Sequence, residues 1–131
     1  MGIRLDVRPM SINAAYSIRK GRKLKTKEYR TYETKVLVLL TTKKIKIDLP
    51  DKGELYLFLK IGVSSRFDLD NAIKPFLDIL QKKFNFNDNR VTKISLEKEI
   101  VSRGSEYIEF FLSPRWVNGK PKEEFVARQT K

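Results

Sequence analysis

The side chains best suited to chemistry lie in one short segment, Asp68-Leu69-Asp70-Asn71-Ala72-Ile73-Lys74. If the strand expected before this segment continues through it, Asp68 and Asp70 point to the same side, with backbone positions about 6.6 Å apart. Both carboxylates can then reach one cation. Mg²⁺ prefers oxygen ligands, and a water that it retains can attack a phosphate. The segment therefore predicts a site for metal-dependent hydrolysis.

Two further groups complete the predicted site. Lys74 can neutralise charge on a phosphate or protonate a leaving oxygen. Asp88 lies in a polar turn before the next predicted strand and is the candidate for a third metal ligand. Asp78, one helical turn beyond Lys74, is expected to pair with that lysine or to cap surface interactions. The alternative is that Asp70 only caps a helix and that Lys74 is a solvated charge or a passive phosphate contact.

The composition of the chain supports a polyanionic partner and narrows the chemistry. Its 131 residues include 28 Lys and Arg against 16 Asp and Glu, a net charge of +12. A basic surface attracts phosphate, whereas paired carboxylates repel it unless a divalent cation joins them. The chain has no cysteine and no histidine. Thiol and imidazole chemistry are therefore excluded, and carboxylates and lysine remain as catalytic groups.

Membrane surfaces are the rival polyanion. No apolar run approaches the roughly 20 residues of a transmembrane helix, and no signal peptide opens the sequence. We therefore expect a cytoplasmic protein with neither a membrane partner nor a small-molecule cofactor.

A basic segment near the start of the chain is the main candidate for phosphate binding. Residues 11–26 are expected to form a loop, and no acid interrupts its lysines and arginines before Glu28. Such a run is more often only a solvated face, but here it precedes a predicted helix. Tyr16, Phe67 and Trp116 can stack on bases, although core packing explains Phe67 equally well and Trp116 is undecided. The predicted DNA-binding residues are Asn13, Tyr16, Arg19, Lys20, Arg22, Lys23, Lys25, Lys27 and Asn71.

Hydrophobic periodicity predicts the elements that must position these groups. Thr26 is the expected N-cap of the first principal helix, and Pro75 lies in the first turns of the second, at about residues 71–83. Ser102-Arg103-Gly104 is expected to join the last two strands as a hairpin. The predicted strands are 2–8, 45–49, 54–63, 91–101 and 105–112, with 54–63 at the centre of the sheet.

These elements predict an α+β fold, with a mixed β-sheet and two principal helices in a single domain over residues 1–112. Residues 113–131 form a basic tail that is either loose or dependent on a dimer. One distance is tight. A helix that continues to Lys83 places its end about 20 Å from Asp70. The five residues from there to Asp88 can span at most about 18 Å, which is too short for Asp88 to return to Asp70. Either the helix ends by about Gln81, or Asp88 completes the site across a dimer interface.

Three segments resemble the RusA family of phage-type Holliday junction resolvases. Residues 65–80 fit the family pattern D-x-D-N-x-x-K-x-x-x-D-x-L, and Asn87-Asp88-Asn89-Arg90-Val91 resembles the acidic segment that follows it. Residues 9–16 resemble the family's P-x-S-x-N segment. One departure is Asn87, which stands where the family often has the first of two adjacent aspartates.

The resemblance implies the roles of the site residues. Asp68, Asp70 and Asp88 would ligate Mg²⁺, or Mn²⁺ in its place, and Lys74 would act at the scissile phosphate. It also implies a homodimer that nicks two strands of four-way junction DNA, encoded by a phage or prophage in a bacterial host. Two other functions stay open: a non-catalytic nucleic-acid-binding module, and a metal nuclease that acts on flaps, other branched structures or RNA.

Overall fold

A four-stranded mixed sheet is the centre of the fold. The computed structural model describes residues 2–64, 66–122 and 126–128, with side chains described as far as residue 122. The strand order is β1-β7-β5-β6, and only the β5–β6 pair is parallel. The bounds of these strands are β1 Ile3–Leu5, β7 Tyr107–Ser113, β5 Leu55–Val63 and β6 Val91–Ile100. The predicted α+β class, the mixed sheet and the central position of β5 are confirmed.

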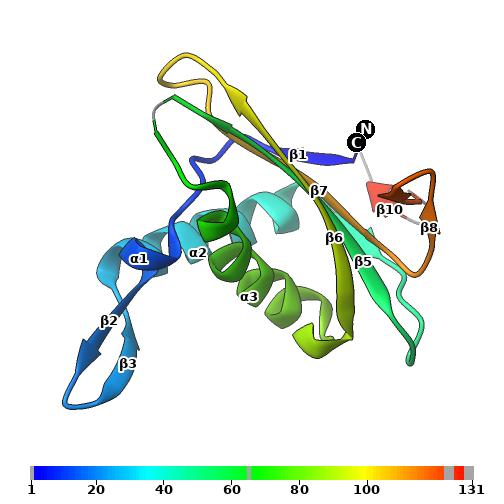
Figure 1. The fold of residues 1–131 in the computed structure, drawn as a ribbon, viewed down its shortest axis with the longest axis horizontal. Coiled ribbons are helices and arrows are strands. Elements are labelled where there is room, and N and C mark those ends of the chain that lie inside the picture. Colours follow the sequence, from blue (N-terminus) through cyan, green and yellow to red (C-terminus); the bar gives the residue numbers. More distant parts are fainter. Residues whose placement is uncertain (1, 65, 123–125, 129–131) are drawn as a thin grey trace.

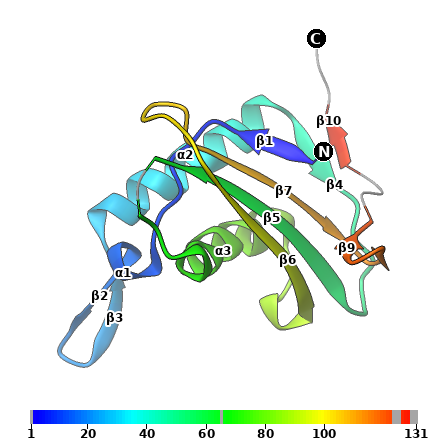
Figure 2. The ribbon, with the colours of Figure 1, turned by 45° about the horizontal axis from the view of Figure 1, so that its top comes forward.

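Two helices cover one face of this sheet, as Figures 1 and 2 show. They are α2 (Lys27–Thr42) and α3 (Ile73–Phe84). Alternate residues of β5 point to them, because side chains of a strand alternate between its two faces. These inward-facing residues of β5 are Leu55, Leu57, Leu59, Ile61 and Val63. They are buried in one core with residues of the two helices, among them Tyr29, Val36, Phe76 and Leu80.

The opposite face of the sheet is covered in part by the end of the chain. Phe58 of β5 stacks on Phe111 of β7 with ring centroids 5.1 Å apart. A hairpin of β8 (Trp116–Val117) and β9 (Lys120–Pro121) places Trp116 edge-on to Tyr56, 5.7 Å between centroids. Farther on, β10 (Val126–Arg128) pairs with β4 (Ile45–Ile47). The predicted tail thus contains regular structure within a single chain; residues 123–125 and 129–131 lie outside the described residues.

The predicted hairpin between β6 and β7 is wrong. Both strands pair with β5, one on each side, so they do not pair with each other. The reason lies in their burial. β7 is buried along nearly its whole length and takes an interior position, whereas β6 exposes much of its surface at the edge. β5 and β6 run parallel because α3 connects them, as parallel neighbours require a crossover.

The predicted loop over residues 11–26 is also wrong. It folds as α1 (Ile12–Ala15) followed by a two-stranded hairpin, β2 (Tyr16–Arg19) and β3 (Arg22–Lys25). Lys20 and Gly21 form its turn with φ values of 50° and 73°, the left-handed pair that a two-residue hairpin favours. Figure 1 shows this hairpin projecting from the body of the domain. Because its strands bury almost nothing, hydrophobic alternation could not predict them.

Thr26 fixes the base of the hairpin to the core. Its hydroxyl accepts from the Tyr29 backbone N–H as the N-cap of α2, which confirms the predicted cap, and it also donates to the carbonyl of Ala14 at 2.7 Å. β1 is shorter than predicted, because the Val7 amide turns back to the Leu5 carbonyl at 2.9 Å. Within the described residues, no helix is long and apolar enough to cross a membrane.

Candidate active site

Asp68 and Asp70 lie where the chain passes from the central strand to α3. The strand ends at Val63, and a 3₁₀ helix, η1 (Leu69–Ala72), precedes α3. The strand therefore does not continue through the two aspartates, which was the condition for expecting their carboxylates on one side. Lys98 of β6 holds this segment by donating to the Phe67 carbonyl at 3.2 Å. Both carboxylates are exposed, and neither makes a hydrogen bond or ion pair to a described residue.

The structure also decides the capping alternative. The residue at the N-cap position of η1 is Asp68, whose side chain makes no capping hydrogen bond, and the residue at the N-cap of α3 is Ala72. Asp70 lies inside η1 and caps nothing. Its carboxylate is free to interact with a cation from solvent.

Lys74 lies between two carboxylates. Its Nζ is 2.8 Å from Oδ1 of Asp78 and 3.1 Å from Oδ2 of Asp88. The predicted pairing with Asp78 is confirmed. The hydrogen bond to Asp78 raises the pKa of Lys74 above its ordinary value, and the bond to Asp88 adds to the effect. Lys74 is therefore a charged donor with a defined position.

Asp88 reaches Lys74 within the same chain although α3 does not end by Gln81. The helix continues to Phe84, and Asn85 then reverses the chain in a left-handed conformation, with φ at 55°. The side chain of Gln81 accepts from the Asp88 backbone N–H at 2.9 Å, which holds the second 3₁₀ helix, η2 (Asp88–Arg90), against α3. The long side chain of Lys74 covers the remaining distance.

Tyr16 connects the projecting hairpin to this cluster. Its hydroxyl donates to Oδ2 of Asp78, on the other side of the carboxylate from Lys74. Its ring packs against Tyr29, 5.2 Å between centroids, and the Tyr29 hydroxyl donates to the Pro75 carbonyl at 2.9 Å. Burial and the bond to Asp78 raise the pKa of Tyr16 to about 12. Sequence spacing gave no signal for a contact between residues 62 positions apart.

The basic side chains of the hairpin divide into two groups. Lys25 is engaged with Glu33 at 3.2 Å, and the Lys23 Nζ lies over the ring of Tyr16, 4.2 Å from its centroid. The other predicted phosphate contacts are exposed and make no ion pair within the part of the chain that is described: Arg19, Lys20, Arg22 and Lys27. Asn13 and Asn71 line one small hollow together with Asp68.

The donor set fits a hard divalent cation in its chemistry but is not gathered into a cage. Asp68, Asp70 and Asp88 offer only oxygen ligands at exposed or half-buried positions, where a cation can keep its waters. No group of three acidic side chains in residues 2–64 and 66–122 lies close enough to hold one metal ion. The predicted ligand set therefore stays a prediction.

The bond between Tyr16 and Asp78 predicts a measurable shift in titration. An unfolded tyrosine has a pKa of about 10. The contribution of Tyr16 to stability is thus fully present below pH 10 and is lost as the pH rises toward about 12. Replacing Asp78 by Asn should lower the pKa of Tyr16, though not to 10, because burial persists. Phenolate absorbance, taken as the difference between each protein and its Tyr16→Phe variant, measures this; an unchanged midpoint would show that Asp78 does not hold the hydroxyl.

Comparison with known proteins identifies a family. A search of curated proteins finds no match. A family model described as Endodeoxyribonuclease RusA matches residues 6–109. That range covers most of the chain and includes the hairpin, both 3₁₀ helices and all four residues of the predicted catalytic set. The chain therefore belongs to the RusA endodeoxyribonuclease family.

Proposed function

We propose that this protein is a Mg²⁺-dependent endonuclease that resolves four-way DNA junctions as a homodimer, nicking two strands symmetrically. The observation that carries the proposal is the position of Lys74, a protonated amine held by Asp78 and Asp88 and four residues after Asp70, whose carboxylate is exposed. Membership of an endodeoxyribonuclease family supports hydrolysis of a phosphodiester as the reaction. Mn²⁺ is an alternative metal.

Asp68, Asp70 and Asp88 would hold the metal ion. Asp88 uses Oδ2 for Lys74, whereas its Oδ1 makes no hydrogen bond or ion pair to a described residue. When bound, the ion would supply an activated water and neutralise charge on the phosphate. The three carboxylates would also repel a phosphate in its absence, which makes productive binding depend on the cation.

Lys74 would act on the phosphate directly. A charged donor aimed at developing charge contributes most when it does not have to reorganise, and Asp78 holds the ammonium from the neighbouring helical turn. The same ammonium can donate a proton to the leaving oxygen. A purely passive contact would instead affect binding and leave the turnover rate unchanged.

The projecting hairpin would hold the DNA backbone. Arg19, Lys20 and Arg22 lie at its tip, exposed and without an ion pair to a described residue. Phosphate contacts of this kind position a nucleic acid without reading its sequence. Lys25 contributes less, because Glu33 already neutralises it at 3.2 Å.

Asp70→Asn tests the catalytic assignment. This change removes the charge that would bind the cation but keeps the size and hydrogen-bonding capacity of the side chain. We expect junction binding as tight as in wild type or tighter, with cleavage abolished. The substrates are synthetic four-way junction, flap, duplex and single-stranded DNA and RNA, each with and without Mg²⁺.

Asp51→Asn, an exposed carboxylate in the turn before β5, is the matched control and should cleave normally. Normal cleavage by Asp70→Asn at saturating Mg²⁺ would contradict the assignment. Binding indifferent to Mg²⁺ with intact strands would favour a non-catalytic binding module. If the protein cleaves flaps or RNA in preference to the junction, then flaps or RNA, and not the junction, are its substrate.

The salt dependence of binding tests the hairpin. Each neutralised phosphate releases counterions, so the double variant Arg19→Ala/Arg22→Ala should flatten the slope of log affinity against log salt by up to about 2. Lys25→Ala should change the slope less, because its ammonium is already paired with Glu33. Fluorescence anisotropy over a salt series measures both. Equal slopes in wild type and the double variant would remove the hairpin from the DNA interface.

A further inference from the structure

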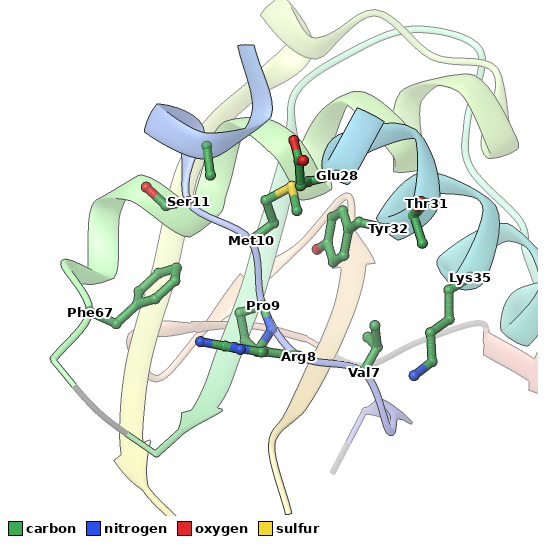
Figure 3. Close-up of a pocket in the computed structure, with 11 residues that line it drawn as sticks. Val7, Arg8, Pro9, Met10, Ser11, Glu28, Thr31, Tyr32, Lys35 and Phe67 are labelled. Atoms are coloured by element: carbon green, nitrogen blue, oxygen red, sulfur yellow. The ribbon is translucent and has the colours of Figure 1, made fainter. Parts of the chain in front are cut away.

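An open groove of about 470 Å³ lies on the other side of Phe67 from the acidic segment. Figure 3 shows Phe67 on one side, Tyr32 of α2 on the other, and Pro9 and Met10 between them. This volume falls within the range of pockets that hold small organic groups. The groove lies beside the candidate active site, and Phe67, one of its walls, is a residue that the sequence indicated as able to stack on a base.

The groove continues into the candidate active site. A smaller hollow lined by Asp68, Asn71 and Asn13 shares two residues with the groove, Ser11 and Phe67. Phe67 is directly bonded in sequence to Asp68, and Lys98 holds its carbonyl. A nucleotide whose phosphate lies at the acidic segment therefore has this groove as an adjacent place for its base.

The polar groups around the groove suit a nucleotide. Arg8 and Lys35 supply two cations and Glu28 one carboxylate, which can accept from a base amino group. The Tyr32 hydroxyl is buried and makes no hydrogen bond to any described residue. Figure 3 shows it directed toward Pro9 and Met10. Buried polar groups are rarely left unpaired, and a base carries acceptors that would satisfy this donor.

We propose that this groove binds an unpaired nucleobase of the strand whose phosphate lies at Asp68 and Asp70. The proposal rests on the proposed function for its substrate. A flat aromatic base with polar edges matches a floor of Pro9 and Met10, the ring of Phe67 and the cations at the rim, whereas an aliphatic ligand would leave the Tyr32 hydroxyl unpaired. Extruding a base costs least where pairing is already broken, as at a branch point.

The test uses DNA with 2-aminopurine in place of one base at the junction centre, and the same oligonucleotide as a single strand, with Ca²⁺ in place of Mg²⁺ so that a cation with oxygen ligands is present. Stacking on Phe67 should change the emission when wild type binds. Phe67→Ala should remove most of this change and weaken single-strand binding roughly fivefold or more. Phe67→Tyr should retain it. Val38→Ala, an exposed apolar residue on α2 outside the groove, is the control and should behave as wild type.

Tyr32→Phe separates a binding role from a structural one. Because the hydroxyl has no partner in the described chain, its removal should leave the unfolding midpoint unchanged or higher while reducing the emission change. Loss of stability with an unaltered emission change would overturn the proposal.

The remaining outcomes are equally decisive. The 2-aminopurine probe is placed at each position around the branch point in turn. If wild type binds and the emission changes at none of these positions, the inference is overturned, whether or not the protein cleaves DNA. Emission changes that need Phe67 in a protein that cleaves nothing would support the base site and overturn the nuclease. A change of oligomeric mass in Phe67→Ala with unaltered emission would assign the groove to contact between copies of this chain and overturn the base site.

Discussion

The ammonium of Lys74 between Asp78 and Asp88 is the contact on which the arrangement of this site depends. It joins the first turn of α3 to the next turn of the same helix and to η2, which returns from the far end of the helix. All three side chains are partly exposed, so each ion pair contributes little to folding stability. Their effect is on geometry: a long, flexible side chain is restricted to one position beside the exposed acidic segment.

Asp78 extends that restraint to the projecting hairpin. One of its oxygens accepts from Lys74 and the other from Tyr16, the first residue of the hairpin. Tyr16 in turn packs on Tyr29, whose hydroxyl holds the Pro75 carbonyl beside Lys74. The hairpin and the lysine therefore share a small, partly buried network, and a displacement of one changes the surroundings of the other.

Elements with a buried face could be predicted from the sequence, and those without one could not. β5 and α2 have apolar residues at regular spacing, and Thr26 caps α2 as its sequence position indicates. The hairpin of β2 and β3 buries almost nothing, so its residues were predicted as part of a loop. The prediction that β6 and β7 form a hairpin was wrong for a different reason. Two strands that are adjacent in sequence usually pair, but here β5 lies between them in the sheet.

The site shows the same division. The pair Lys74 and Asp78 follows from helical spacing, but the contact of Tyr16 with Asp78 and the return of Asp88 depend on tertiary structure. The distance argument for Asp88 assumed that it must reach Asp70. In the structure α3 continues to Phe84, and Asp88 contacts the end of the Lys74 side chain within the same chain.

The single-turnover rate of four-way junction cleavage by Lys74→Ala tests the central claim most directly. If Asp78 and Asp88 hold this ammonium for the reaction, cleavage should slow by about 10²-fold or more with junction affinity little changed, whereas Lys82→Ala on the same helix should cleave as wild type does. A rate close to that of wild type for Lys74→Ala, under conditions where wild type cleaves, would contradict the account.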